Sequence, residues 1–218
     1  PKKLLIYGAH FGHDFKDAVA YGWQPHQPTH DWGTLIANKN EELDRLNGIY
    51  INLLTGAGVD IHEGRGRLVD QHTVQVGQKA ITAETILVAT GGWPFVPDIP
   101  GGEHAITSNE ALELPERPRR ILIVGGGYIA VEFAGIFAGL GSEVTVVIRG
   151  EELLRGFDND LRVELAQAMN RDGVEIHTRS NISRISKDEA GLTARTDRGA
   201  DISADVVMFA TGRAPNTR

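Results

Sequence analysis

The sequence contains no cysteine, which excludes disulfide bonds and thiolate metal sites within this chain. Long hydrophobic runs are also missing, since none approaches the roughly 18 apolar residues that would suggest a membrane span. The formal net charge is −7, which argues against broad binding to nucleic acid or to an anionic membrane. Because the chain starts with proline and no signal-like segment follows, we do not expect Pro1 to be the natural N-terminus.

Glycine, by contrast, is abundant. The chain has 218 residues, of which 26 are glycine and 41% are hydrophobic, and this composition fits one large or two small α/β domains. Apolar strands are predicted at 121–124, 143–149 and 174–177, with helices at 128–140 and 161–171 between them. This β-α-β-α-β order predicts a parallel sheet.

A dinucleotide-binding fingerprint, Gly125-x-Gly127-x-x-Ala130, lies between the first of these strands and its helix. Gly125 permits a tight turn, Gly127 lets the backbone approach a pyrophosphate, and the small Ala130 lets the helix pack on the strand. The free N–H groups of the first helical turn would face the phosphates, and the helix dipole favours negative charge there. An ordinary strand–turn–helix without a ligand is the alternative.

Cations stand where an NAD site usually keeps a carboxylate. The second strand of such sites commonly ends in Asp or Glu, which binds the ribose hydroxyls. Here the strand ends in Arg149, and Arg155 follows in the next loop. Arginine suits a phosphate dianion, so the pair predicts NADP, which carries a 2′-phosphate. Alternatively, both arginines are solvated and Glu151 or Glu152 binds an NAD ribose.

Glu132 interrupts an otherwise apolar helix and lies four residues after Tyr128, on the same face. It is either the exposed position of the helix or a partly buried carboxylate paired with a cation near a nicotinamide. Lys2, on composition alone, is a solvated surface charge. His10 and His13 have no third ligand near them in the sequence, so no metal site is predicted.

Two helices are predicted near the start of the chain, in part of 1–22 and over 40–56. Asn40 can cap the second helix, and Tyr50 belongs to its apolar stripe. Taken alone, that stripe predicts Tyr50 to be a core aromatic. Between the helices, the prolines of 25–28 mark a loop with His26 at the surface.

Strand-like segments follow the second helix. Alternation at 59–62, 66–69 and 73–76 predicts a small antiparallel meander, and the apolar run at 85–88 predicts a buried strand. The proline-rich stretch 93–118 is predicted to be a linker with a short helix near 108–114. Residues 182–202 then predict a β-hairpin with a turn at Arg198 and Gly199.

Several segments together resemble the flavoprotein disulfide reductases, and within that family they are similar to the glutathione reductases. The similarity covers essentially the whole chain and is carried by residues 1–5, 45–50, 127–132, 154–158 and 210–216. The family's first FAD fingerprint and its two redox cysteines precede the segment that matches Pro1. Its second FAD stretch, dimer interface and catalytic histidine follow the segment that matches Arg218.

The resemblance implies a role for particular residues. Lys2 would lie beside the flavin and pair with Glu132, and Tyr128 would cover the flavin until nicotinamide displaces it. Tyr50 would contact the disulfide substrate. The residues implied at the NADP site are Gly125, Gly126, Gly127, Tyr128, Ile129, Glu132, Arg149, Arg155 and Gly212. The residues implied at the FAD site are Lys2, Gly66, Thr90, Gly91 and Arg213.

The expected fold is therefore α/β and three-layered, of the Rossmann-like FAD/NAD(P)-binding type, with small antiparallel meanders. Residues 1–91 would be the later part of an FAD-binding domain. Residues 92–213 would be an NADP-binding domain that includes the linker at 93–118, and residues 214–218 would begin the return to the FAD-binding domain.

The implied activity of the full-length protein is NADPH-dependent reduction of glutathione disulfide through FAD and a cysteine pair, in a cytoplasmic or organellar homodimer. This chain alone is expected to be inactive, because it has no thiol to accept electrons. Trypanothione reductase, thioredoxin reductase and a redox-silent NADP-binding module are the alternatives. No nucleic-acid, membrane or metal ligand is expected.

Overall fold

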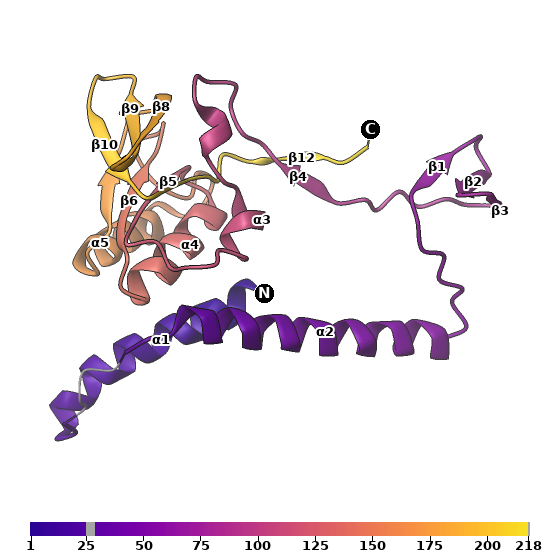
Figure 1. Cartoon of the computed structure of the whole chain (residues 1–218), viewed down its shortest axis with the longest axis horizontal. Coiled ribbons are helices and arrows are strands. Elements are labelled where there is room, and N and C mark those ends of the chain that lie inside the picture. The colour runs from indigo at the N-terminus through magenta and orange to yellow at the C-terminus, as the bar shows by residue number, and fades with distance from the viewer. Residues whose placement is uncertain (25–28, 218) are drawn as a thin grey trace. The chain divides into compact units, whose positions relative to one another are not determined.

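The computed structural model describes residues 1–24 and 29–217 (Figure 1). The predicted loop at 25–28, with His26, lies outside the described residues. The chain divides into two compact units, the first made of Pro1–Lys39 and Gly92–Ala214 and the second of Asn40–Gly91 and Pro215–Arg218. Within the described part, no helix has the length and apolar character needed to cross a bilayer.

A four-stranded parallel sheet forms the centre of the first unit, in the order β11-β5-β6-β7. Its strands are β5 (Arg120–Val124), β6 (Glu143–Val147), β7 (Glu175–His177) and β11 (Val206–Phe209). Helix α4 (Tyr128–Gly139) connects β5 to β6, and α5 (Asn159–Arg171) connects β6 to β7. The α/β class and the parallel sheet predicted from the element order are confirmed.

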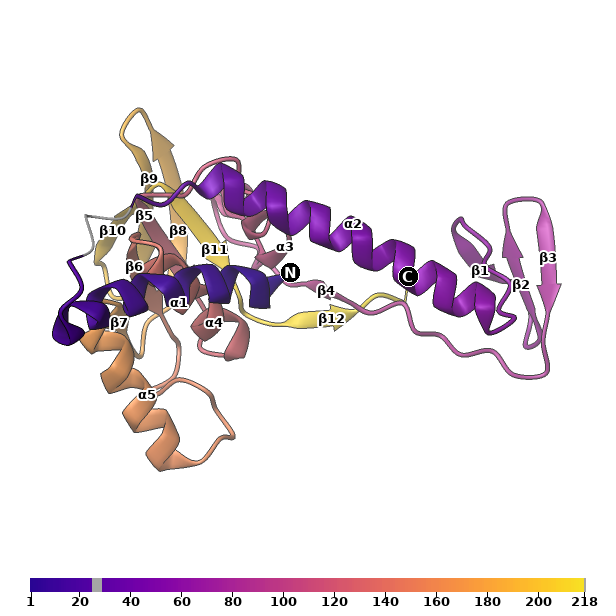
Figure 2. The same ribbon diagram turned by 90° about the horizontal axis from the view of Figure 1, so that it is seen from below.

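The two faces of this sheet pack against different layers (Figure 2). Alternate residues of β5 point in opposite directions, so Ile121 and Ile123 join a core with the helices, whereas Leu122 joins a second core. That second core lies against an antiparallel sheet. The strands of this sheet are β8 (Ile182–Asp188), β9 (Gly191–Thr196) and β10 (Asp201–Ala204). The unit therefore has three layers, with helices on one face and a meander on the other.

The first unit also contains helix α1 (Lys2–Ala18), which is followed by the 3₁₀ turn η1 (Val19–Tyr21). The described chain then enters helix α2 (Trp32–Gly56), which starts eight residues before the predicted start at Asn40. Asp31 accepts a hydrogen bond from the Thr34 N–H at 3.0 Å and caps it. The early start is stabilised by tertiary contacts, because Trp32 and Lys39 are both buried.

The segment predicted as a linker contains several short elements. Strand β4 (Gly92–Pro94) pairs with β12 (Arg213–Pro215), and the 3₁₀ turn η2 (Gly102–His104) precedes the short helix α3 (Ser108–Ala111). The predicted short helix is thus confirmed at its first residue, but it ends three residues before the predicted end at Leu114.

The second unit contains the C-terminal part of α2 and a three-stranded antiparallel meander. Its strands are β1 (Gly66–Leu68), β2 (Thr73–Val76) and β3 (Lys79–Thr82). The meander is confirmed, but the strand predicted at 59–62 is wrong, and 79–82 forms the third strand instead.

The buried strand predicted at 85–88 is also wrong, because these residues form no strand and Leu87 is 87% exposed. A strand needs a hydrogen-bonded neighbour, and this segment has none among the described residues. The predicted division into cofactor-binding domains at 1–91, 92–213 and 214–218 is not tested by the packing and stays a prediction. The compact units differ from it in that Pro1–Lys39 packs with Gly92–Ala214.

Candidate dinucleotide-binding site

The glycine-rich turn joins β5 to α4 at the carboxyl edge of the parallel sheet. Gly125 has φ 138°, a conformation that residues with a side chain rarely adopt, and a Cβ placed there would lie 2.4 Å from the carbonyl oxygen of Ala210. The Gly125 N–H donates to the Val147 carbonyl at 2.9 Å. The turn is therefore close to the ends of both neighbouring strands, β6 and β11, and only glycine fits its first position.

The N-terminus of α4 opens toward free space. Gly127 is the N-cap residue and provides no side-chain cap, and a Cβ placed on it would meet nothing within 4 Å. The first helical hydrogen bond is donated by Val131 to the Gly127 carbonyl. The N–H groups of Tyr128, Ile129 and Ala130 have no acceptor among the described residues, so they can bind an anion. This open cradle fits a dinucleotide pyrophosphate.

Ala130 is fully buried, as its small side chain predicted, and helps α4 pack on the sheet. The helix is held on its other side by α1. A Cβ at Gly12 would lie 2.7 Å from the Gly139 carbonyl, and a Cβ at Gly139 would lie 2.9 Å from the Ala9 side chain. Small residues therefore let the two helices approach closely where they cross.

This crossing places the start of α1 beside the start of α4. Lys2 forms an ion pair with Glu132, and its ammonium group lies 5.1 Å from the centre of the Tyr128 ring. The side chains of Lys2 and Glu132 are 28% and 38% exposed. Both the exposed-helix alternative for Glu132 and the solvated alternative for Lys2 are therefore wrong, and the pairing of the two is confirmed. Their role beside a flavin stays a prediction.

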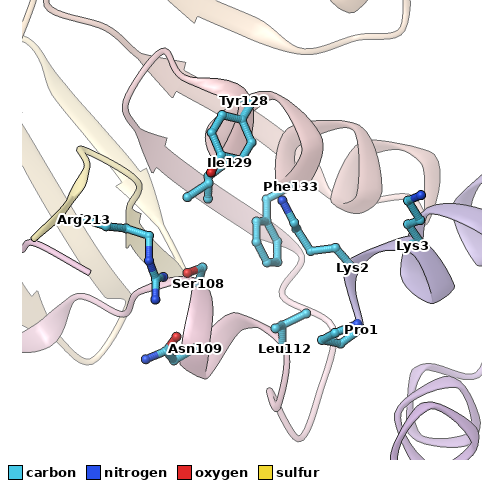
Figure 3. Close-up of a pocket in the computed structure, with 10 residues that line it drawn as sticks. All are labelled: Pro1, Lys2, Lys3, Ser108, Asn109, Leu112, Tyr128, Ile129, Phe133 and Arg213. Carbon is cyan, nitrogen blue, oxygen red and sulfur yellow. The ribbon is translucent and has the colours of Figure 1, made fainter. Parts of the chain in front are cut away.

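A cavity of about 510 Å³ lies next to this group (Figure 3). Figure 3 shows Lys2 and Arg213 on opposite sides of the cavity and the α3 residues on a third side. The lining residues are Pro1, Lys2, Lys3, Ser108, Asn109, Leu112, Tyr128, Ile129, Phe133 and Arg213. Four predicted site residues, Lys2, Tyr128, Ile129 and Arg213, thus line one cavity together with residues that the sequence analysis did not select.

The sequence predicts the short helix α3 but not its position at this cavity. Thr107 and Glu110 form a capping box, in which the Asn109 N–H donates to the Thr107 hydroxyl and the Thr107 N–H donates to Glu110 at 2.7 Å. The hydrogen bond from the Thr107 hydroxyl is the main cause that lowers the pKa of Glu110. The pattern Thr-x-x-Glu therefore marks the start of the helix that carries Ser108.

The loop after β6 carries both predicted phosphate ligands. Arg149 and Arg155 are exposed, and neither forms an ion pair with another described residue. The Leu154 N–H donates to the Gly126 carbonyl at 2.7 Å, which ties this loop to the glycine-rich turn. Two guanidinium groups without an ion-pair partner in the described part of the chain are therefore attached to the same backbone framework as the open N-terminus of α4.

The carboxylates that could bind an NAD ribose instead are already paired. Glu151 lies 2.9 Å from Arg179, and Glu152 lies 2.9 Å from Arg162. Because these pairs occupy the acidic groups of the loop and leave the basic groups free, the geometry favours the NADP alternative.

The residues implied at an FAD site belong to both units. Gly66 begins β1, the Thr90 hydroxyl donates to the Asn216 carbonyl, and the Gly91 carbonyl accepts from the Asn216 N–H, all within the second unit. In the first unit, the Arg213 guanidinium donates to the Gly92 carbonyl.

Two further predicted residues have open surroundings. Gly212, with φ 136°, follows β11, and a Cβ placed there would meet nothing within 4 Å. Tyr50 is 62% exposed on α2, so the prediction that it is a core aromatic is wrong. Its contact with a disulfide substrate stays a prediction.

Comparison with known proteins shows the family to which this chain belongs. The model of the pyridine nucleotide-disulphide oxidoreductase family matches residues 1–218, and the chain belongs to that family. Glutathione reductases and flavoprotein disulfide reductases of this family use FAD and NADPH.

Sequence relatives show which members of the family the chain is similar to. The chain is 53% identical to the chloroplastic/mitochondrial glutathione reductase of Pisum sativum and covers 40% of it. It is 45% identical to a glutathione reductase of a Nostoc strain and covers 48% of it. It is 40% identical to the trypanothione reductase of Trypanosoma congolense and covers 47% of it. All or nearly all of this chain is matched in each case.

Among solved structures, the chain is similar to the HOCl-induced flavoprotein disulfide reductase RclA from Escherichia coli. The TM-score is 0.86 at 29% identity, and the match covers the whole of this chain and 47% of that one. The chain thus spans less than half the length of the relatives it matches.

Proposed function

We propose that the full-length protein reduces glutathione disulfide with NADPH and that this chain supplies its NADPH-binding unit. The observation that carries the proposal is the joint position of two features that the Leu154–Gly126 hydrogen bond connects. These are the open N-terminus of α4 and the pair Arg149 and Arg155, which form no ion pair with any residue that the structure describes. The higher identity to glutathione reductases than to a trypanothione reductase supports the substrate.

Each part of the site has a separate task in this proposal. The N–H groups of the first turn of α4 bind the pyrophosphate, and the two arginines bind the 2′-phosphate. Tyr128 covers the cavity until the nicotinamide ring displaces it. Glu132 keeps the Lys2 ammonium at the cavity wall, where its positive charge favours electron density arriving on a neighbouring ring.

FAD would supply the acceptor for the hydride of NADPH, and a cysteine pair of the full-length protein would supply the thiols that reduce the disulfide by exchange. This chain contributes Lys2, Gly66, Thr90, Gly91 and Arg213 toward FAD and Tyr50 toward glutathione disulfide. Since the chain has no cysteine, we expect it to show no disulfide reductase activity by itself. A cytoplasmic or organellar homodimer is part of the proposal for the full-length protein.

The test measures NADPH oxidation by the full-length protein with glutathione disulfide, trypanothione disulfide or oxidised thioredoxin. We expect turnover with glutathione disulfide to exceed that with the other two. Faster turnover with another disulfide would identify that disulfide as the substrate in place of glutathione disulfide. NADPH binding without turnover of any disulfide would favour the redox-silent module.

The same protein allows a test of the Lys2–Glu132 pair. We expect Glu132→Ala to slow flavin reduction by NADPH in stopped-flow measurements, because Lys2 loses its partner. Glu164→Ala is the matched control, since it removes the carboxylate of an exposed ion pair with Arg171. Equal flavin reduction rates in the two variants would leave the pair without a role in the reaction.

A further inference from the structure

The loop that carries the two proposed phosphate ligands also carries carboxylates. Glu151 and Glu152 lie in sequence between Arg149 and Arg155, and a third carboxylate, Asp158 at the end of the loop, accepts hydrogen bonds from the first N–H groups of α5. An uncompensated carboxylate near a bound phosphate dianion repels it and weakens binding. A loop of this composition can therefore select a phosphate only if its carboxylates are neutralised.

Each of the two glutamates is neutralised by an arginine from another part of the first unit, but the two pairs differ in burial. The side chains of Arg179 and Glu151 are 60% and 73% exposed, so water and salt screen this pair strongly. The side chains of Arg162 and Glu152 are 19% and 37% exposed. The pair formed by Arg162 therefore has the larger effect on the local field.

Arg162 also bonds to the backbone of the loop. Its Nε donates to the Leu153 carbonyl at 2.7 Å, while its terminal nitrogen lies 2.9 Å from Glu152. Leu153 is 1% exposed, and Leu154 has φ 48°, in the left-handed region that a leucine rarely adopts. A strained residue keeps such a conformation only where its surroundings hold it. Arg162 on one side and the Gly126 carbonyl on the other provide those surroundings.

We propose that Arg162 is a positioning residue for cofactor selectivity, which neutralises Glu152 and fixes residues 152–154 so that the phosphate meets only the cations of this loop. The inference rests on the proposed NADPH site and adds a residue that does not itself touch the cofactor. It predicts that loss of Arg162 weakens binding of the 2′-phosphate and leaves the rest of the dinucleotide unaffected.

The test titrates the full chain with NADPH and NADH, with 2′,5′-ADP and AMP as smaller probes. Arg162→Met is compared with Arg171→Met, which removes an arginine from the same helix whose partner Glu164 lies outside the loop. We expect Arg162→Met to weaken binding of NADPH and 2′,5′-ADP about tenfold, equivalent to about 1.4 kcal/mol. Binding of NADH and AMP should not change, and Arg171→Met should bind all four probes as the unmodified chain does.

A second substitution separates neutralisation from a general loss of structure. Glu152→Gln in the Arg162→Met background should restore most of the NADPH affinity, because it removes the carboxylate that became unpaired. Two variants that leave Arg162 in place provide the same test if Arg162→Met does not fold. Glu152→Asp, whose shorter carboxylate loses the contact but keeps its charge, should weaken NADPH binding, whereas Glu152→Gln should not.

Three results for the variants would overturn the inference. The first is that Arg162→Met loses NADPH and NADH affinity equally, and the second is that it keeps the full preference for NADPH. The third is that Glu152→Gln weakens NADPH binding as much as Glu152→Asp. Equal affinity of the unmodified chain for NADPH and NADH would overturn the proposed NADPH site as well, whereas a preference that Arg162→Met leaves intact overturns this inference alone.

Discussion

The two compact units bury their apolar side chains to very different degrees. The first unit has two cores that cover both faces of its parallel sheet, with Phe133, Phe137 and Val146 fully buried. In the second unit, none of the described residues is buried, and Tyr50, Leu53 and Leu87 are all mostly exposed. The first unit thus contains the partners of its own apolar faces, whereas the second has apolar faces with no partner among the described residues.

This contrast explains where each unit obtains its stability. Burial of apolar surface is the dominant favourable contribution to folding, and it needs two complementary faces. Strands with alternating apolar and polar residues, together with amphipathic helices, indicate local structure in both units. Among the described residues, however, apolar faces pack against each other and form a core only in the first unit. The glycine-rich turn and the start of α4 lie on that core, which keeps their backbone groups in place.

The largest expected effect comes from removing a large side chain from the first unit. Phe137→Ala deletes a fully buried ring that stacks on Trp32, and we expect it to lower the free energy of unfolding by about 3–5 kcal/mol. Tyr50→Ala is the matched aromatic control in the second unit and should change stability by less than about 0.5 kcal/mol. Urea denaturation followed by circular dichroism measures both, and equal losses would break the comparison between the units.

A smaller loss is expected at the turn that the core supports. Gly125→Ala combines a left-handed φ with a Cβ only 2.4 Å from the Ala210 carbonyl oxygen. Backbone strain alone costs about 1–3 kcal/mol, and we expect the clash to add to this loss of stability. Gly199→Ala, at φ 86° with open space around its Cβ, measures the strain without the clash. Thermal unfolding of the two variants compares them, and an unaffected Gly125→Ala would show that the turn is not constrained.

The smallest expected effect is pH-dependent. Asp205 accepts hydrogen bonds from the Arg120 side chain and N–H, which connect the start of β11 to β5. Partial burial, the largest single influence, raises the pKa of Asp205, but the Arg120 hydrogen bonds and charge together lower it below its ordinary value. The carboxylate therefore stabilises the fold above about pH 4 and loses this contribution as the pH falls through its lowered pKa.

We accordingly expect Asp205→Asn to cost about 1 kcal/mol at pH 7, a value reduced for partial exposure, and progressively less below pH 4. The exposed pair of Asp201 with Arg195, 3.6 Å apart, gives the control variant Asp201→Asn. Denaturation at several pH values compares the two. A cost of Asp205→Asn that stays constant down to pH 2 would contradict this account.

The sequence predicts those parts of the fold and site that depend on neighbouring residues. The fingerprint at Gly125, Gly127 and Ala130 defines a turn and a helix start by local stereochemistry, so the sequence alone identifies it. The order of strands and helices likewise determines the parallel sheet, because connections of this kind are right-handed and place sequential strands side by side.

The rest depends on partners that are distant in the sequence. The pairing of Lys2 with Glu132 spans 130 residues, and only the family resemblance predicts it, since composition alone makes Lys2 a solvated charge. The start of α2 was missed because buried contacts of Trp32 and Lys39 outweigh the capping signal at Asn40. The run at 85–88 looks like a buried strand, but pattern alone cannot supply the neighbour that a strand requires.

The central claim is that Arg149 and Arg155 select NADPH, and a titration tests it most directly. The unmodified chain and an Arg149→Ser/Arg155→Ser variant are titrated with NADPH and NADH, and an Arg184→Ser/Arg198→Ser variant removes two exposed arginines of the antiparallel sheet as a control.

Charge-assisted hydrogen bonds contribute about 1.5–3 kcal/mol each. Because both arginines are exposed and solvent screens them, we discount this sum and expect a preference for NADPH on the order of a hundredfold. We expect the Arg149/Arg155 variant to lose that preference and keep its NADH affinity, with the control unchanged. NADPH affinity should also fall as salt rises. Equal binding of both cofactors by the unmodified chain, or equal loss of both in the variant, would contradict the claim.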